Sequence, residues 1–234
     1  AKEVAEALQL ILSENSREIL AQRPSLDPQA YDYYLRALEY LRKSSSSESL
    51  EAAVTLFKKA TTLDENYAEA HAGLCEAYLE RYSQSVAVVD FTAAQAACQR
   101  ALSLDSKALA VYLALGNLYR YSGEYDAAIS EFNKALSLAP KSVEAYIGLG
   151  DTYREDGKPK QAEEMFTRAI ELQPNYWRSY MAMGTYFFVA GRYEEAIPYY
   201  SPITELMPDN ARAFNNLGGA YYMLGQFELA ATAM

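Results

Sequence analysis

The chain has 234 residues and a formal net charge of −10. This acidic balance argues against nucleic acid as a partner, because proteins that neutralise phosphates present a basic face. The longest apolar runs fall short of the roughly 18 residues that cross a bilayer, so no membrane span is predicted.

Residues 1–29 are predicted to form one amphipathic helix and a linker. Val4, Leu8 and Ile11 recur at helical spacing, as the apolar stripe of a helix does. The segment from Arg23 to Pro28 contains two prolines, which favour a break in the helix. We expect this helix to pack against, or to cap, the structure that follows.

Two helical hairpins are predicted next, over residues 30–67 and 68–108. The first has a lengthened polar turn at Ser44 to Ser47. Ala60 and Ala101 hold equivalent positions in the two hairpins and are 41 residues apart, seven more than the spacing found further along the chain. About two extra helical turns are therefore expected around residues 81–90.

The second hairpin holds the residues most open to a chemical interpretation. His71 falls at an aromatic core position and is the single histidine, so we expect a packed structural residue without a catalytic or metal-binding role. Cys75 and Cys98 are 23 residues apart, unlike the CxxC motif of zinc and redox sites. Both replace small or apolar residues on facing helices, so we expect buried, reduced thiols, with a disulfide between them as the alternative.

From residue 109 onward the pattern repeats every 34 residues. Such a period is typical of a stacked-repeat solenoid, in which each unit buries its apolar face against its neighbours. The repeating positions are Gly116, Gly150, Gly184 and Gly218; Gly123, Gly157, Gly191 and Gly225; Ala128, Ala162, Ala196 and Ala230; Tyr119, Tyr153, Phe187 and Tyr221; and Pro140, Pro174 and Pro208.

The unit at residues 143–176 shows how this pattern specifies two helices. Tyr146, Leu149 and Tyr153 make the apolar stripe of a first helix. Gly157 ends this helix, and Pro159 opens the second at a position where its missing N–H is tolerated. The small residues of the repeat let the two backbones approach closely, so we expect an elongated stack without one central core.

These residues resemble the tetratricopeptide repeat (TPR), whose signature orders an aromatic residue, Leu-Gly, a second aromatic residue, a turn glycine, and then Ala, Phe, Ala and Pro. The unit at 109–142 shows it as Tyr112, Leu115, Gly116, Tyr119, Gly123, Tyr125, Ala128, Phe132, Ala135 and Pro140. The resemblance implies an all-α, right-handed superhelical solenoid with a concave groove. Its six units lie at approximately 30–67, 68–108, 109–142, 143–176, 177–210 and 211–234, the last of them truncated.

The resemblance also implies a function, namely a non-catalytic scaffold that binds a protein or peptide in its groove and needs no cofactor or metal. The front half is similar to TPR regions attached to bacterial serine/threonine kinases, nucleotide cyclases and winged-helix regulators, so a regulatory or sensor region is an alternative. Self-association through the terminal helices is another. The chain starts at Ala1 and ends inside a helix pattern, which favours a fragment of a longer protein. Its location stays open: we favour the cytoplasm, with an extracytoplasmic position beside a membrane-spanning signalling protein as the alternative.

In this family the outward-facing residues of each first helix line the concave groove. The last two units place arginines beside aromatic and sulfur-containing side chains, which suits a peptide with an acidic group and an apolar anchor. The alternative is that these are ordinary or covered surface residues. The groove positions also include Arg42, Glu69, Glu76, Glu80, Glu144 and Glu155. The candidate site residues are Asn117, Arg120, Tyr121, Asp151, Arg154, Arg178, Met181, Thr185, Phe188, Arg212, Asn215 and Tyr222.

Two more specific sites are not predicted, and one distortion is. A chaperone carboxylate clamp needs a second asparagine where this chain has Gly148 after Asn117. The adjacent Gly218 and Gly219 lack the Lys-Ser/Thr and the preceding strand of a phosphate loop. Pro202 lies deep in a predicted helix that also contains a proline at position 198, and we expect this helix to kink where an amide hydrogen bond is lost.

Overall fold

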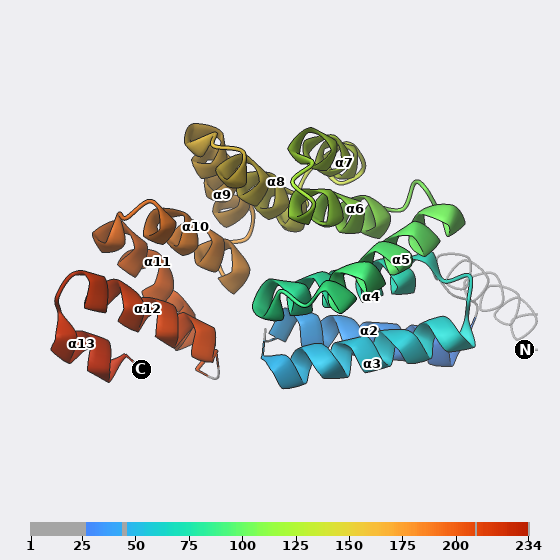
Figure 1. Ribbon diagram of the computed structural model, residues 1–234, viewed down its shortest axis with the longest axis horizontal. Helices are drawn as coiled ribbons and strands as arrows, with labels where there is room; N and C mark the ends of the chain where they lie inside the picture. Colours follow the sequence, from blue (N-terminus) through green and yellow to red (C-terminus); the bar gives the residue numbers. More distant parts are fainter. Residues whose placement is uncertain (1–26, 44–45, 209, 234) are drawn as a thin grey trace, which may run out of the picture.

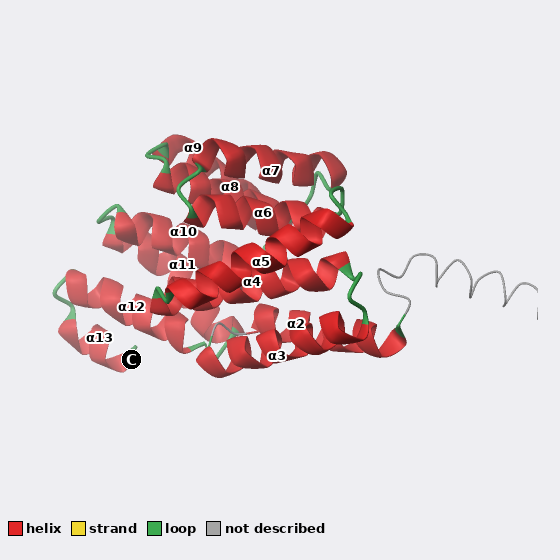
Figure 2. Ribbon diagram, turned by 45° about the vertical axis from the view of Figure 1, so that its right-hand side comes forward, coloured by secondary structure: helices red, strands yellow, loops and turns green. Residues whose placement is uncertain are grey.

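The computed structural model describes residues 27–43, 46–208 and 210–233, which form twelve α-helices and no strand (Figure 1, Figure 2). None of these helices combines the length and the hydrophobicity that a membrane span requires. The N-terminal helix predicted within residues 1–29 lies almost wholly outside the described residues. The helices are α2 (Pro28–Lys43), α3 (Ser47–Leu63), α4 (Ala68–Ser85), α5 (Val88–Leu104), α6 (Leu109–Tyr121), α7 (Tyr125–Leu138), α8 (Val143–Glu155), α9 (Pro159–Leu172), α10 (Trp177–Val189), α11 (Tyr193–Leu206), α12 (Ala211–Met223) and α13 (Phe227–Thr232).

Consecutive helices pair into hairpins, and the hairpins follow one another around an arc (Figure 1). The first helices of neighbouring hairpins contact one another, α2 with α4, α4 with α6, α6 with α8 and α8 with α10. They form an inner wall, while the second helices lie on the outside. This arrangement confirms the all-α solenoid expected from the repeat.

Local sequence explains where several of the helices begin. The side chain of Asp27 accepts hydrogen bonds from the first amides of α2, at 2.7 and 3.0 Å. Ser142 and Asn210 do the same at the starts of α8 and α12, and Pro159 occupies the first turn of α9. Such caps satisfy amide groups that have no partner within the helix.

The two glycines of each repeat serve different purposes. A Cβ atom on Gly150 would lie 2.4 Å from the ring of Phe166, so this glycine makes room for a buried aromatic ring of the second helix. The turn glycines instead adopt the left-handed conformation that favours glycine. Their φ angles lie between 72° and 78° at Gly123, Gly157, Gly191 and Gly225.

The second hairpin is extended, as its spacing predicted. Its helices α4 and α5 have 18 and 17 residues, compared with 13 and 14 in α6 and α7. Arg81 holds the extension in place through ion pairs with Asp90 at 2.9 Å and with Glu51 at 2.8 Å. The inner wall is therefore taller here than in the following units.

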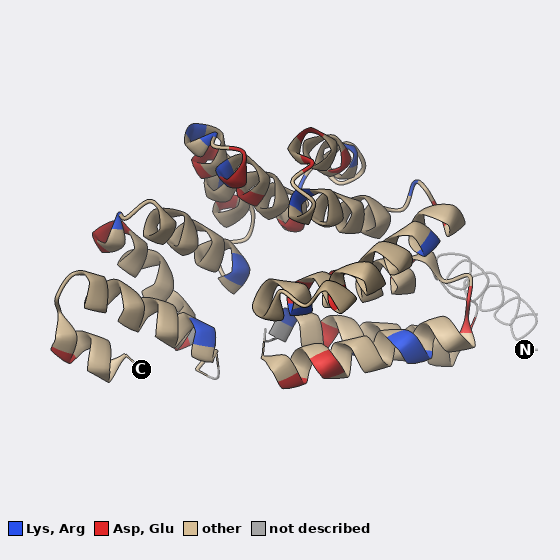
Figure 3. Cartoon of the chain, in the orientation of Figure 1, with Lys and Arg blue, Asp and Glu red and all other residues tan. Residues whose placement is uncertain are grey.

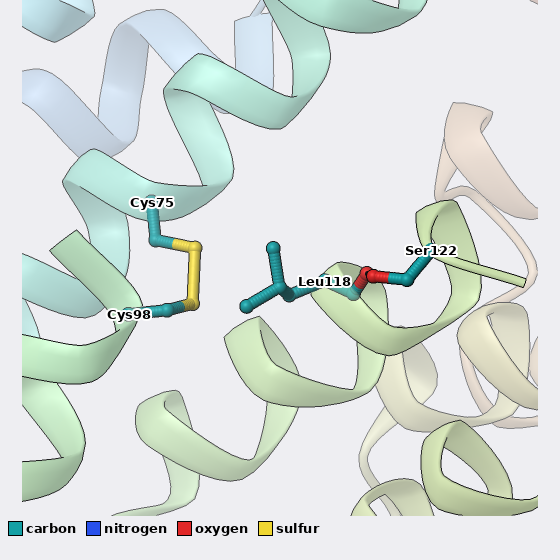
Figure 4. Close-up of a disulfide and its surroundings, with 4 residues drawn as sticks. All are labelled: Cys75, Cys98, Leu118 and Ser122. Carbon is teal, nitrogen blue, oxygen red and sulfur yellow. A yellow bond between two sulfur atoms is a disulfide. The ribbon is translucent and has the colours of Figure 1, made fainter. Parts of the chain in front are cut away.

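The two cysteines form a disulfide between α4 and α5, so the expectation of reduced thiols is wrong and the alternative holds (Figure 4). The Cα atoms of Cys75 and Cys98 lie 5.3 Å apart, within the span of about 4.4–6.8 Å that a disulfide bridges. Both residues are fully buried, beside Leu118 of α6. The close approach of the two helices at small side chains brings the sulfur atoms together.

Two other expectations concerned single residues. His71 is half-buried rather than fully packed, and its Nε2 atom lies 3.2 Å from the main-chain oxygen of Glu65 in the preceding turn. Burial lowers its pKa, against the opposing effect of this hydrogen bond. The helix α11 continues through Pro198 and Pro202 to its end, and the expected kink remains a prediction.

Candidate binding cavity

The inner wall is closed by a contact between the fifth hairpin and the first. The indole Nε1 of Trp177 donates a hydrogen bond to the main-chain oxygen of Arg42 at 3.0 Å, and the guanidinium of Arg178 donates one to the main-chain oxygen of Leu41. The two acceptors belong to the last turn of α2, whose carbonyl groups have no partner within the helix. A cation at this end of a helix is also favoured by the helix dipole. The start of α10 therefore caps the end of α2.

Arg178 also forms an ion pair across the groove, with Glu80 of α4 at 3.3 Å. Burial acts to lower the pKa of Arg178, but the negative charges of Glu80 and Glu76 outweigh it and raise the pKa, so the guanidinium stays cationic. The sequence placed Arg178 at a groove position without a nearby acid in its own unit. The structure supplies the acid from a different unit, and this arginine is a bridging residue.

A cavity of about 340 Å³ lies next to this contact, and Leu41, Arg42 and Arg178 form part of its lining. It is enclosed by the first helices of the first four hairpins and by the beginning of α10. Its walls combine leucine and isoleucine side chains with tyrosines and charged groups. The lining residues are Tyr34, Leu38, Leu41, Arg42, Glu76, Leu79, Glu80, Leu109, Ala110, Leu113, Asn117, Arg120, Tyr121, Ser142, Glu144, Ile147, Gly148, Asp151, Tyr176 and Arg178.

One side of the cavity is an ion-pair network. Arg120 pairs with Glu155 at 2.8 Å, and Arg154 pairs with the same carboxylate at 2.9 Å and with Asp151 at 3.2 Å. The side chain of Arg120 is only 10% exposed, and its guanidinium lies 4.2 Å from the ring centre of Tyr121. The charges of this network are largely matched within the protein.

Glu76 and Glu144 differ from Glu80 and Asp151, the other two carboxylates of the lining. No hydrogen bond or ion pair involves either carboxylate among the described residues. Burial, aided by the negative charges of Glu144 and Glu80, raises the pKa of Glu76 to about 7, although Arg178 and Arg42 act in the opposite direction. A carboxyl group that is costly to ionise in the unliganded protein therefore faces the cavity.

Five of the twelve candidate site residues line this cavity, and Arg154 lies beside it through its contact with Asp151. The structure therefore brings together the predicted residues of the third and fourth units with one residue of the fifth. The five residues are Asn117, Arg120, Tyr121, Asp151 and Arg178.

The other candidates do not join them. Met181 is buried, and its Sδ atom accepts a hydrogen bond from the side-chain amide of Asn216 at 3.2 Å. Thr185 accepts a hydrogen bond from Tyr200 at 3.4 Å, and the ring of Phe188 packs edge-on against that of Tyr193. Arg212, Asn215 and Tyr222 are exposed on α12. Figure 3 shows how little charge α10 and α12 carry beyond their N-terminal ends.

The candidate site residues did not include Tyr34, Leu38 or Leu41 of the first hairpin, and sequence reasoning missed the role of Glu76. The glutamate was at a groove position, but nothing in the sequence shows that it would lack a partner. Tyr34 and Leu38 belong to the least regular unit, where the repeat register is weak. Among the described residues, no group of three or more His, Cys, Asp or Glu side chains is arranged to hold a metal ion.

Two family models described as tetratricopeptide repeat match the chain, one at residues 110–175 and the other at 181–234. No curated protein sequence matches it significantly. Among solved structures, the chain is similar to PilF of Pseudomonas aeruginosa, with 22% identity, 88% of each chain covered and a TM-score of 0.54. It is similar to a thermophilic TPR protein of Thermus thermophilus, with 18% identity, 82% of this chain and 99% of that chain covered and a TM-score of 0.66. It is also similar to PilW, a widely conserved type IV pilus biogenesis factor, with 18% identity, 88% and 91% covered and a TM-score of 0.60. At these identities the likeness concerns the fold.

Proposed function

The chain belongs to the tetratricopeptide repeat family, and we propose that it is a non-catalytic scaffold that binds an extended peptide segment of a partner protein in the cavity between α2 and α10. The observation that carries this proposal is the mixed lining of the cavity. Leu38, Leu113 and Ile147 offer apolar contacts, while Asn117 and the carboxylates offer polar ones. Apolar walls with a few polar groups are the usual composition of a ligand site.

The size of the cavity limits the ligand. Its volume of about 340 Å³ is near the lower end of the roughly 300–1,000 Å³ found for ligand pockets. An α-helix with side chains has a diameter of about 10 Å and would not fit without opening the contact between α2 and α10. A short extended segment that inserts a few side chains fits the space as it stands.

A cavity-filling variant tests the proposal. Asn117 lies on the cavity wall, and no hydrogen bond involves its side chain among the described residues, so Asn117→Trp fills the space without removing a contact. Asn133→Trp is the matched control, because Asn133 is exposed on α7 of the same hairpin. Peptides selected from a random heptapeptide display library on the wild-type protein are titrated into both variants. We expect Asn117→Trp to lose at least tenfold in affinity and Asn133→Trp to bind like the wild type. Equal binding by both variants would contradict the proposal.

Self-association is a second candidate, favoured by one observation. The last hairpin exposes Tyr222, Met223, Phe227 and Leu229, each between 49% and 62% accessible. Apolar side chains exposed on a terminal hairpin form a surface on which another repeat or another copy can stack. Light scattering over a concentration series tests it: a dimer lost in Phe227→Ser supports it, and a monomer at all concentrations contradicts it.

The regulatory region of a signalling enzyme is the remaining alternative. It depends on segments outside this chain, and the full-length gene decides it.

A further inference from the structure

The charged groups of the cavity are unequally matched. The lining contains three arginines and four carboxylates. Arg178 is paired with Glu80, Arg120 with Glu155 outside the lining, and Asp151 with Arg154 outside the lining. The charged lining residues outside these pairs are one arginine, Arg42, and two glutamates, Glu76 and Glu144.

The paired arginines have little left to offer to a ligand. The terminal nitrogens of Arg120 bind Glu155, and those of Arg178 bind Glu80 and the Leu41 carbonyl. The Nε atoms of both arginines lack a hydrogen-bond partner, but they are buried and have no accessible surface to offer to a ligand. An acidic ligand would have to displace these partners. The unpaired groups that remain open to the cavity are mainly acceptors.

We infer that the cavity selects a basic side chain, the ammonium of a lysine or the guanidinium of an arginine, next to an apolar side chain, with Glu76 and Glu144 as the acceptors of its charge. This inference rests on the proposed function. It reverses the acidic ligand that the sequence suggested.

The surrounding residues suit such a ligand. The aliphatic stem of a lysine or arginine packs well on apolar surface, which Leu38 and Leu79 supply. A cation over an aromatic face gains further attraction, and Tyr34 and Tyr176 line the same cavity. Charge-assisted hydrogen bonds to a carboxylate are among the stronger ones in proteins.

The state of Glu76 agrees with this ligand. Its pKa of about 7 means that ionisation in the empty cavity is opposed by burial and by the negative charges nearby. A bound cation would reverse the electrostatic part of that cost, so the carboxyl group would release its proton on binding near neutral pH. The groups that act on Glu76 are Arg42 on α2, Glu80 on α4, Glu144 on α8 and Arg178 on α10.

The same heptapeptide selection tests the inference. The enriched sequences are expected to contain lysine or arginine beside a large apolar residue. The best peptide is then synthesised with lysine and with norleucine at the basic position. Both are titrated into wild type, into Glu76→Gln/Glu144→Gln and into Glu39→Gln/Glu205→Gln. The last variant makes the same change of charge at two exposed glutamates that do not line the cavity.

We expect Glu76→Gln/Glu144→Gln to weaken the lysine peptide at least tenfold, with no loss in the control variant. The norleucine peptide should bind wild type as weakly as the lysine peptide binds Glu76→Gln/Glu144→Gln, and its affinity should not fall further in that variant. Enrichment of acidic peptides, or unchanged affinity in Glu76→Gln/Glu144→Gln while Asn117→Trp still abolishes binding, would overturn the inference and leave the proposed function standing. Peptides that bind Asn117→Trp as well as wild type would overturn both.

Discussion

Arg178 donates a hydrogen bond to the main-chain oxygen of Leu41, which lies 137 residues earlier in the chain. With the Trp177 bond to the carbonyl of Arg42, 135 residues earlier, this contact joins the fifth hairpin to the first. An open groove becomes a cavity because the arc returns on itself at this point. Access to the candidate site therefore depends on the contact between α2 and α10.

Arg178→Gln should destabilise the protein by about 1–3 kcal/mol, because Glu80 and the Leu41 carbonyl would each lose a partner in a partly buried setting. Arg212→Gln is the matched control: Arg212 occupies the same repeat position 34 residues later and is exposed. Its effect should stay within about 0.5 kcal/mol. Urea unfolding measures both, and equal effects of the two substitutions would show that the closing contact contributes nothing.

Glu76 makes stability depend on pH. Its pKa is raised from 4.5 to about 7 in the folded protein, so between these values the folded state holds a proton that the unfolded state has released. By linkage, this group makes the free energy of unfolding fall as the pH rises from about 4.5 to 7, by about 3 kcal/mol. Glu76→Gln should remove this part of the slope and should stabilise the protein above pH 7.

Urea unfolding of wild type and Glu76→Gln at pH 5, 6, 7 and 8 measures this effect. Other groups titrate in both proteins, so the difference between the two curves isolates Glu76. The account is contradicted if the difference does not change with pH.

The disulfide between Cys75 and Cys98 can be tested directly against the reduced thiols that the sequence led us to expect. A thiol assay under denaturing, non-reducing conditions should detect no free thiol, since Cys75 and Cys98 are the two cysteines of the chain. Cys75→Ala/Cys98→Ala should lower the free energy of unfolding by about 2–4 kcal/mol, a typical effect of removing such a cross-link. Two free thiols in the oxidised protein would contradict the structure at this point.

The two glycine roles predict different responses to alanine. Gly150→Ala places a methyl group where the ring of Phe166 lies, and overpacking of this kind costs about 1–3 kcal/mol. Gly157→Ala meets no atom but forces alanine to a φ of 72°, at a cost of about 1–2 kcal/mol. Adding Phe166→Leu should recover part of the Gly150→Ala loss and none of the Gly157→Ala loss, as measured by thermal or urea unfolding.

The sequence predicted the fold well because the repeat is local. Gly150, Phe166 and Gly157 lie within one unit, and the contacts that need them form within that unit or with the next one. The same reasoning explains why the extended second hairpin could be recognised from the spacing of Ala60 and Ala101. Repeating side-chain sizes encode short-range packing directly.

The candidate site was only partly predictable because it depends on curvature. Small rotations between successive units accumulate until Arg178 contacts Leu41 and Glu80. The spacing of residues in the sequence does not reveal this total rotation. Asn117 and Arg120 line the cavity, but whether a charge there is paired depends on units far away in the sequence. For Cys75 and Cys98, the sequence placed both in the core, but the expectation that they stay reduced was wrong.

The central claim is that the ligand occupies the cavity rather than another surface, and photo-crosslinking tests it most directly. Photo-leucine, a diazirine analogue of nearly the same size as leucine, replaces Leu113, on the cavity wall, or Leu138, which is 56% exposed on α7. A selected heptapeptide is irradiated with each protein, and the products are resolved by mass spectrometry. We predict a specific adduct at position 113, competed by unlabelled peptide, and none at position 138. A competed adduct at 138 with none at 113 would contradict the account.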